Sequence, residues 1–286
     1  MKPANFSYFR PRNAAEAIAM LASAGEDARV LAGGQSLVPM MNFRIVRPSA
    51  LVDLADCADL AYARADGGKL RIGAMMRQRE AQADAVILQH CPLVAEALAH
   101  AGPTTVRNRA TVGGTIANGY PVAELPVVAV CLDAEIVLNG PQGTRTVPAR
   151  DFFIVGMVTA IETGELLREV VFPARGPRTG YGFAESGNHA GGAAQAIAAI
   201  GAEADGAGWK DVRIAAAGLR SVPVRLPESE HAVAVGWPLA EAFAADLERL
   251  EAEEDGLEAD AGQRRLVQIV VEDALARLRT VEETAA

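Results

Sequence analysis

The first part of the chain alternates apolar and polar residues with helical and then strand spacing. Residues 14–24, "AAEAIAMLASA", have helical spacing, with Asn13 as the expected N-cap, Glu16 at the capping-box position and Gly25 as the stop. The apolar runs "ARVLAG" (28–33) and "ALVDL" (50–54) then read as short buried strands. Helix and strands within the first 55 residues predict a small α/β unit.

The middle of the chain continues with a strand, "KLRIGAM", and a helical stretch over residues 79–101. An interruption at Cys91-Pro92 suits the first turn of a second helix, because proline needs no amide hydrogen bond there. "TVGGTIANGYP" reads as a glycine-rich loop, and "LPVVAVCLD" as an apolar helix or strand. A hairpin then turns around residues 141–143, with Ala134, Ile136 and Leu138 on one face, and "LLREVVFP" reads as a closing strand.

The second half of the chain places strands before helices. Residues 173–180, "PARGPRTG", are dense in Pro, Gly and Arg and are the best candidate for a linker. Two strand-like stretches, "AAQAIAAIGAEA" and "KDVRIAAAGL", follow, and helical patterns cover about 238–254 and 262–282. The predicted class of this half is α+β.

Composition narrows the possible partners. A length of 286 residues favours two domains, and a net charge of −9 argues against nucleic acid. We expect a cytoplasmic protein, because the chain lacks both a long apolar run for a membrane span and a secretory signal. Cys57, Cys91 and Cys131 lie far apart and read as buried thiols, and the histidines show no ligand spacing, so we expect no metal site.

Two glycine pairs carry the candidate chemistry. The first glycine motif comprises residues 32–36, "AGGQS", and the second comprises residues 111–115, "TVGGT", and continues through Asn118. In each, a glycine pair removes the Cβ atoms that would keep a backbone amide from an anion, and Ser or Thr adds a hydroxyl donor. Two such segments can clamp a pyrophosphate, although one glycine pair alone is more typical of a turn. Neither matches a nicotinamide or NTPase phosphate motif.

Two longer segments containing these motifs resemble a known family. "LAGGQSLVPMMNFRIVRPSALVDL" and "RNRATVGGTIANGYPVAELPVVAVCLDAEIVL" are similar to the FAD-binding medium subunit of the xanthine oxidase (molybdenum hydroxylase) family. Similar flavoproteins occur in carbon monoxide dehydrogenase, quinoline oxidoreductase and nicotine dehydrogenase. The resemblance implies an α+β chain with a two-subdomain FAD-binding domain of the vanillyl-alcohol-oxidase (PCMH) type, at 1–175. Its subdomains would span about 1–56 and 57–175, followed by a smaller α+β domain at 176–286.

The resemblance also implies the residues that bind FAD. The first motif would hold the pyrophosphate through backbone amides and the Ser36 hydroxyl, and the second would hold the other side of the diphosphate and the ribityl chain. Glu124 stands where relatives carry an acid that accepts hydrogen bonds from cofactor hydroxyls, and Leu167 matches an apolar position that packs on the cofactor. The complete expected set is Ala32, Gly33, Gly34, Gln35, Ser36, Leu37, Thr111, Val112, Gly113, Gly114, Thr115, Asn118, Tyr120, Glu124 and Leu167.

The chain departs from this pattern in two places. Tyr120 replaces the Asp or Ser that relatives often carry before the proline, and it either covers the isoalloxazine or is an ordinary loop tyrosine. Where relatives tend to have a lysine and an arginine pair, this chain has Gly182, Glu185 and Ser186, which puts a cationic contact to the flavin in doubt.

Other polar and large side chains have simpler interpretations. Arg107 and Arg109 either steer an acidic partner or the diphosphate, or support the loop by backbone hydrogen bonds. The Met40-Met41 pair is expected to fill the core beneath the first motif, and Trp209 and Trp237 to pack in the second domain.

The family resemblance implies a function as an FAD-carrying electron-transfer subunit. A large partner subunit would hold the molybdenum cofactor and a small one two [2Fe–2S] clusters, in a dimer of heterotrimers. No catalytic residue is expected in this chain, since substrate chemistry belongs to the partner and electron transfer to the flavin. Two alternatives remain open: a stand-alone FAD-dependent oxidoreductase of the same fold, and a flavin-free scaffold subunit.

Overall fold

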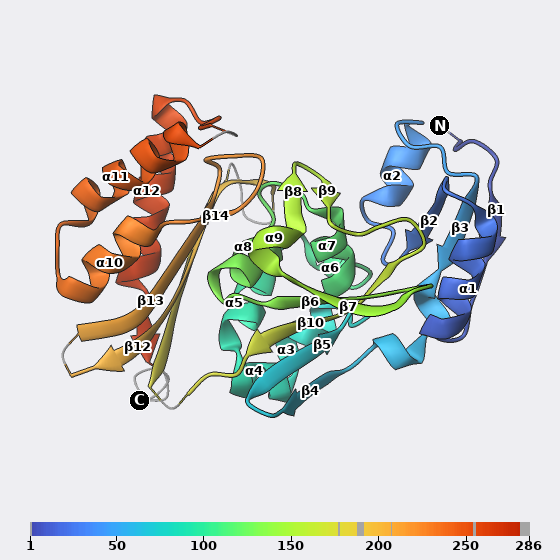
Figure 1. The fold of residues 1–286 in the computed structure, drawn as a ribbon, viewed down its shortest axis with the longest axis horizontal. Helices are drawn as coiled ribbons and strands as arrows, with labels where there is room; N and C mark the ends of the chain where they lie inside the picture. Colours follow the sequence, from blue (N-terminus) through green and yellow to red (C-terminus); the bar gives the residue numbers. More distant parts are fainter. Residues whose placement is uncertain (1, 177, 188–191, 207, 254–255, 281–286) are drawn as a thin grey trace.

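The described residues fold into three larger sheets and one two-stranded sheet, with helices packed around them (Figure 1). The computed structural model describes residues 2–176, 178–187, 192–206, 208–253 and 256–280. Among these residues, none of the helices combines the length and hydrophobicity needed to traverse a bilayer.

The N-terminal sheet is parallel, with strand order β1-β3-β2. It contains β1 (Ser7–Phe9), β2 (Ala28–Leu31) and β3 (Ala50–Asp53), and it packs with α1 (Ala14–Ala24) and α2 (Leu37–Asn42). The predicted cap of α1 is confirmed: the Asn13 side chain accepts from the Glu16 amide at 2.9 Å, Glu16 accepts from the Arg12 amide, and Gly25 ends the helix at φ +86°. Two short 3₁₀ helices, η1 (Leu54–Asp56) and η2 (Ala58–Leu60), follow β3.

The central sheet is antiparallel, with order β4-β5-β10-β6-β7. Its strands are β4 (Ala63–Asp66), β5 (Lys69–Gly73), β6 (Glu135–Gly140), β7 (Gly143–Pro148) and β10 (Leu166–Pro173). The predicted hairpin is confirmed, since Ile136 pairs with Val147 and Leu138 with Arg145. The associated elements are α3 (Gln78–Ala83), α4 (Ala85–His90), α5 (Pro92–His100), α6 (Thr104–Arg107), α7 (Val112–Asn118), α8 (Glu124–Cys131), α9 (Ala149–Phe152), β8 (Phe153–Val155) and β9 (Val158–Thr159).

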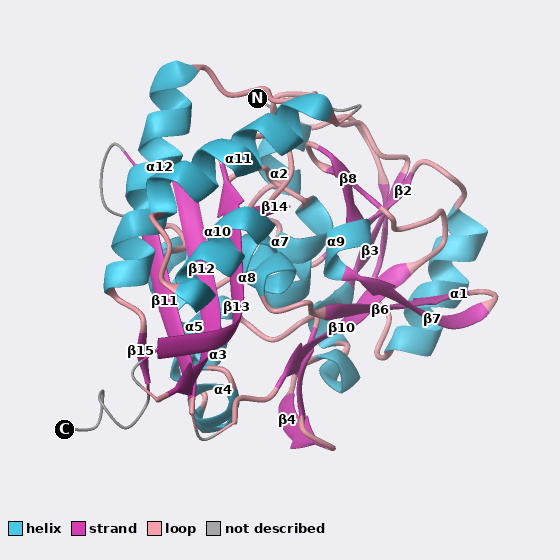
Figure 2. Cartoon of the chain, turned by 60° about the vertical axis from the view of Figure 1, so that its left-hand side comes forward, coloured by secondary structure: helices cyan, strands magenta, loops and turns pink. Residues whose placement is uncertain are grey.

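The C-terminal sheet is also antiparallel, with order β14-β13-β12-β11-β15. Its strands are β11 (Thr179–Gly187), β12 (Ala194–Asp205), β13 (Gly208–Ala217), β14 (Val224–Arg225) and β15 (Arg279–Thr280). Helices α10 (Pro227–Val235), α11 (Leu239–Ala252) and α12 (Ala261–Ala276) lie along one face, as Figures 1 and 2 show.

The other face of this sheet packs against α5 and α8. Because side chains alternate along a strand, Ile197 and Ala199 join the core around α5 and α8, whereas Ala198 and Ile200 join the core beneath α12. The small residues of β12 are therefore buried on both faces. The sheets fall within the predicted ranges 1–56, 57–175 and 176–286, but this shared core crosses residue 175, and the division into domains stays a prediction.

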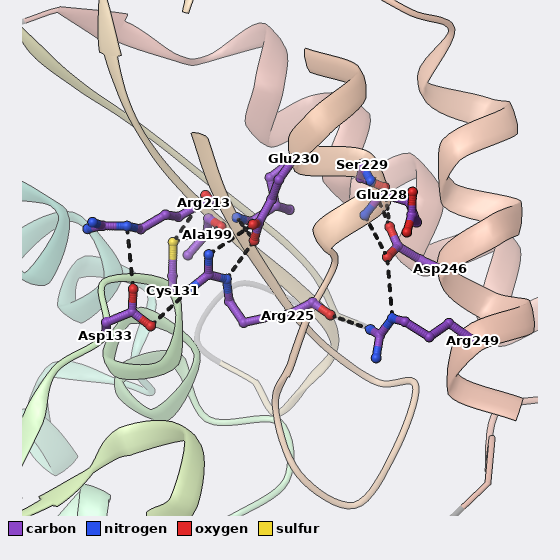
Figure 3. Close-up of polar contacts among 11 residues, drawn as sticks. Cys131, Asp133, Ala199, Arg213, Arg225, Glu228, Ser229, Glu230, Asp246 and Arg249 are labelled. Carbon is purple, nitrogen blue, oxygen red and sulfur yellow. Dashed lines mark hydrogen bonds and ion pairs between the residues drawn. The ribbon is translucent and has the colours of Figure 1, made fainter. Parts of the chain in front are cut away.

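Polar contacts also join the segment after α8 to the C-terminal part (Figure 3). Asp133 forms ion pairs with Arg225 at 3.0 Å and with Arg213 at 3.4 Å. Arg225 forms a second ion pair, with Glu230, at 2.5 Å. The buried Cys131 thiol donates to the Ala199 carbonyl at 3.2 Å. All three cysteines are free and buried, as the sequence predicts.

Several local predictions are wrong. Residues 112–118 form helix α7 instead of a loop, and α10 is an additional helix that the sequence interpretation missed. Trp209 packs partly against the C-terminal core, but Trp237 is 64% exposed and meets only the edge of His231. The predicted helix ends at Glu254 and Glu282 lie outside the described residues.

Candidate functional site

The fold brings the two glycine motifs into direct contact, although about 80 residues separate them along the chain. A Cβ atom on Gly33 would lie 2.3 Å from the Arg109 carbonyl oxygen and 2.7 Å from the Ala110 Cα. A Cβ on Gly114 would lie 3.4 Å from the Ala32 Cβ. Only a residue without a side chain permits the approach at Gly33, so this glycine joins the N-terminal unit to the segment before α7.

The first motif leaves a run of backbone amides open. It follows the end of β2 at Leu31, and Gly34 adopts φ +72°, a left-handed conformation that suits glycine. The amides of residues 33–36 donate to no acceptor within the described residues, and the Ser36 side chain makes no capping hydrogen bond there either. Consecutive open amides form a concave set of donors that suits an anion.

The second motif is different, because its amides already have acceptors. The amide of Val112 donates to Met76, that of Gly113 to Ala74, and that of Gly114 to the Thr111 side chain, at 2.9–3.0 Å. The Thr115 amide donates to the Thr111 carbonyl at 3.1 Å. The amides of residues 112–115 therefore have acceptors within the chain, and the predicted contact of the second motif with the diphosphate stays a prediction.

The glycine at position 113 serves packing. A Cβ there would lie 2.4 Å from the Ala74 Cβ and 2.6 Å from the Ala74 Cα, so α7 approaches the end of β5 too closely for any side chain. Thr111 and Thr115 keep hydroxyl groups at the motif, and the Thr115 hydroxyl accepts from Gln78 at 2.7 Å.

Two cavities lie against the first motif and share Ala32 in their walls. The larger, of about 440 Å³, lies between the N-terminal unit and the central unit, and Leu167 lines it beside Gly113 and Gly114. The smaller, of about 300 Å³, has the residues from Leu31 to Gln35 on one side and Arg77 and Arg109 on the other. Both cavities therefore adjoin the first motif, whose amides at residues 33–36 have no acceptor among the described residues.

The predicted site residues distribute unevenly around this space. The cavity walls contain Ala32, Gly33, Gly34, Gln35, Gly113, Gly114 and Leu167. The remaining predicted residues lie outside both walls: Ser36, Leu37, Thr111, Val112, Thr115, Asn118, Tyr120 and Glu124. Tyr120 is 42% exposed and lies in the segment between α7 and α8.

Glu124 belongs to a separate acidic cluster. It opens α8 and is 8% exposed, and burial raises the pKa of its carboxyl to about 7, with the nearby Glu185 charge acting in the same direction. Glu185 on β11 lies 3.3 Å from His100 Nδ1 on α5, and this hydrogen bond raises the pKa of His100. In the described residues, the second oxygen of Glu185 is buried without a partner.

The arginines before the second motif have different contacts. Arg107 donates to the carbonyls of Ala101 and Gly102, so it supports the loop as one of the two interpretations of the sequence predicts. Arg109 lines the smaller cavity. The sequence interpretation missed Arg77, because nothing in the local pattern of "GAMMRQRE" distinguishes it from a surface arginine.

Comparison with known proteins decides the family. The family model described as the FAD binding domain in molybdopterin dehydrogenase matches residues 4–175, more than half of the chain. The chain belongs to this family. It is a medium-subunit flavoprotein of the molybdenum hydroxylases, whose members are oxidoreductase subunits.

The named relatives of this flavoprotein match different shares of its sequence. It is 41% identical over 184 residues to the carbon monoxide dehydrogenase medium chain of Afipia carboxidovorans, covering 64% of this chain and 63% of that one, less than two thirds of the relative. It is 31% identical over 283 residues to caffeine dehydrogenase subunit beta of a Pseudomonas species, covering 97% and 96%. A solved carbon monoxide dehydrogenase from Hydrogenophaga pseudoflava matches with a TM-score of 0.87 and 32% identity, covering 98% of this chain and 100% of the matched chain. The predicted family and fold class are confirmed.

The residues of this flavoprotein fit FAD on structural grounds. Two neighbouring cavities of about 440 and 300 Å³ suit a dinucleotide, and the amides of residues 33–36, which have no acceptor among the described residues, suit its phosphates. Gly182 is one of the positions where the sequence departs from the family pattern. Packing requires glycine there, since a Cβ would lie 2.1 Å from the Ala274 carbonyl oxygen. In the described residues, no group of three His, Cys, Asp or Glu side chains is placed to hold a metal ion.

Proposed function

We propose that this chain is the FAD-carrying electron-transfer subunit of a three-subunit molybdenum hydroxylase. The observation that carries the proposal is the paired cavity at Ala32, where the first motif presents open amides to a space large enough for a bound cofactor. Bound flavin would supply the redox chemistry, while the chain supplies binding and orientation. Electrons would arrive from [2Fe–2S] clusters on a small partner and leave to an external acceptor.

The proposed roles of the binding residues follow their surroundings. The open amides at Gly33 and Gly34 and the exposed Ser36 hydroxyl would donate to the diphosphate. Leu167, at 5% exposure in the wall of the larger cavity, would pack on an apolar part of the cofactor. Thr111 and Val112 would hold the backbone of the second motif in place, since the Val112 amide donates to Met76 and the Thr111 hydroxyl accepts from the Gly114 amide.

The remaining predicted residues have roles in the proposal beyond the cavity walls. Glu124 would accept hydrogen bonds from hydroxyl groups of the cofactor. Thr115 and Asn118, three residues apart on α7, would face the cofactor from one side of that helix. Tyr120, exposed between α7 and α8, would cover the flavin or form part of an ordinary loop, and only variants distinguish these roles. Gln35 donates to the Gly33 carbonyl at 3.2 Å and would stabilise the turn, and Leu37 begins α2 behind it.

The proposed assembly contains a large subunit with the molybdenum cofactor and the small [2Fe–2S] subunit, as a dimer of heterotrimers. The relatives are medium, beta and alpha chains of complexes, which supports partners for this chain as well. Three free, buried cysteines fit a reducing compartment, and we propose the cytoplasm.

Flavin content after Gly34→Val tests the proposal. A side chain at Gly34 would meet Val38 at 3.2 Å and is strained at φ +72°, so we expect the folded variant to lose its visible flavin absorbance. Gly67→Val is the control, because Gly67 also has positive φ (+55°) but has open space and lies outside both cavity walls. Full flavin content in folded Gly34→Val, or a wild-type chain that never binds FAD, would contradict the proposal. A chain that purifies alone and turns over a substrate would favour the stand-alone oxidoreductase.

A further inference from the structure

The lining of the smaller cavity contains two arginines that form no ion pair with a described carboxylate. The chain carries 36 acidic and 27 basic residues, and many of its arginines form ion pairs. Arg77 and Arg109 form none with any described residue, and the Arg109 side chain also makes no hydrogen bond there. In an acidic chain, two arginines without an ion pair among the described residues, both in the lining of one cavity, form a local excess of positive charge.

The backbone holds both arginines against the first motif. Gly33 approaches the Arg109 carbonyl so closely that a Cβ would lie 2.3 Å from its oxygen, which fixes the Arg109 backbone beside the open amides. The Arg77 guanidinium donates to the same Arg109 carbonyl. Arg77 also forms an isolated antiparallel bridge with Thr111, so the two arginine-bearing segments lie side by side.

The acid in the same cavity offsets only one of the two arginine charges. Asp53 lines the smaller cavity, but its carboxylate accepts from the Tyr8 hydroxyl and from the Ala55 amide at 3.0 Å. The lining of the cavity therefore combines Arg77 and Arg109 with Gly33, Gly34 and Gln35, whose amides have no acceptor among the described residues. Guanidinium forks match phosphate oxygens, and adjacent backbone amides add further donors.

We propose that Arg77 and Arg109 form a phosphate-binding wall of the smaller cavity and make the chain select a flavin dinucleotide over a flavin without phosphate. The proposal rests on the function proposed above and adds the two residues that determine this selectivity. Arg109 acts through its free guanidinium, and Arg77 acts both through its remaining N–H groups and by positioning the Arg109 backbone.

Binding of FAD, FMN and riboflavin to the full-length chain tests this selectivity. Titration of flavin-depleted wild type, R77M and R109M, followed by flavin fluorescence, gives the three dissociation constants. We expect each variant to bind FAD about tenfold to a hundredfold more weakly, the range for loss of a hydrogen bond to a charged group. Riboflavin affinity should change less than about threefold, because the arginines contact phosphate only.

The neighbouring Arg79→Met is the matched control. Arg79 is exposed on α3, two residues from Arg77, and lies outside both cavity walls, so its loss removes one charge without changing the cavity. FAD binding by R79M should equal that of wild type. If R79M weakened FAD as much as R77M and R109M do, general charge would explain the effect and the proposal would be wrong.

Inorganic pyrophosphate tests the same wall without relying on the fold of a variant. We expect it to compete with FAD on the wild-type chain and to do so less well at high salt. Absence of competition, unchanged FAD affinity in both arginine variants, or equal weakening of FAD and riboflavin would each overturn the proposal. A wild-type chain that bound pyrophosphate through Arg109 but no FAD would contradict the proposed function while leaving the phosphate site intact.

Discussion

The two glycine motifs have nearly the same composition but opposite hydrogen-bonding states. In the first, the amides of residues 33–36 have no acceptor among the described residues, and Gly34 has a left-handed backbone. In the second, the amides of residues 112–115 all have acceptors, and Gly113 allows α7 to pack on Ala74. The first motif keeps amides that can donate to a ligand, whereas the amides and Gly113 of the second motif make contacts within the chain.

This difference shows that a glycine pair alone does not identify a phosphate site. Removing a Cβ permits any close approach, whether by a ligand or by another part of the backbone. Gly33 illustrates both possibilities, because its missing side chain admits the Arg109 carbonyl while its own amide stays open. The hydrogen-bond state of the amides distinguishes the two uses.

The largest expected effect comes from Gly113→Ala. Glycine to alanine inside a helix normally stabilises a protein by up to about 1 kcal/mol. Here the new methyl would lie 2.4 Å from the Ala74 Cβ, and we expect a loss of about 3 kcal/mol in the free energy of unfolding. Urea unfolding measures this change.

Gly262→Ala is the control for that substitution. Gly262 is the second residue of α12, as Gly113 is of α7, but a Cβ there would make only an ordinary 3.4 Å contact. Gly262→Ala should be neutral or stabilising. A neutral Gly113→Ala would remove the packing role from the second motif and end the contrast with the first.

The next effect is a pH dependence that originates beside the second motif. Burial raises the pKa of Glu124 to about 7, so the folded chain retains its proton to a higher pH than the unfolded chain does. The contribution of Glu124 to the free energy of unfolding is therefore fully present at low pH and is lost as the pH rises through about 7. We expect the unfolding free energy to fall by about 2 kcal/mol between roughly pH 5 and pH 8. The raised pKa of His100 acts with the same sign.

Glu124→Gln should flatten this dependence, since glutamine stays neutral. The difference in unfolding free energy between variant and wild type, measured in urea at both pH values, isolates Glu124. The exposed Glu241 on α11 provides the control, and Glu241→Gln should leave the slope unchanged. An unchanged slope in Glu124→Gln would show that this carboxyl titrates as an ordinary surface group.

A smaller effect comes from Thr111, whose side chain caps α7. Its hydroxyl oxygen accepts from the Gly114 amide at 3.0 Å, and Thr111 is buried. Thr111→Val should lower the unfolding free energy by about 1 kcal/mol, the usual value of an N-cap, with FAD affinity nearly unchanged. Thr111→Ser keeps the acceptor and should behave as wild type. A large loss of FAD affinity in folded Thr111→Val would instead give this hydroxyl a direct role in binding.

The smallest effect on stability comes from Ser36, the equivalent N-cap of α2. Its side chain makes no capping bond with a described residue, so Ser36→Ala should change the unfolding free energy by less than about 0.5 kcal/mol. FAD affinity should nevertheless fall several-fold, by the roughly 0.5–1.5 kcal/mol of one hydrogen bond. Ser36→Thr retains the hydroxyl as the control. Equal FAD affinity in Ser36→Ala would remove this hydroxyl from the site.

Local sequence signals predict the elements whose stabilising contacts are themselves local. The cap at Asn13, the proline start of α5 and the 135–148 hairpin are confirmed, because a side-chain cap, a fixed φ angle and an alternating pattern act within a few residues. Helix α7 is missed because its two glycines disfavour a helix locally. Its contact with Ala74, nearly 40 residues away, overrides that preference.

The candidate site follows the same rule. The motif residues of the cavity walls are readable from the sequence, but Arg77 reaches the site through the bridge to Thr111. Trp237 shows the converse: a large apolar residue predicts burial, yet it is exposed in the segment between α10 and α11. Only the tertiary arrangement shows which amides remain open and which arginines lack a partner.

Amide hydrogen exchange with and without FAD tests the central contrast most directly. In the flavin-free chain, the amides of residues 33–36 should exchange quickly and those of residues 112–115 slowly. Addition of FAD should slow the first set by at least about tenfold and leave the second nearly unchanged, because only the first lacks acceptors. The opposite pattern, with residues 112–115 protected only by FAD and residues 33–36 unaffected, would contradict the account.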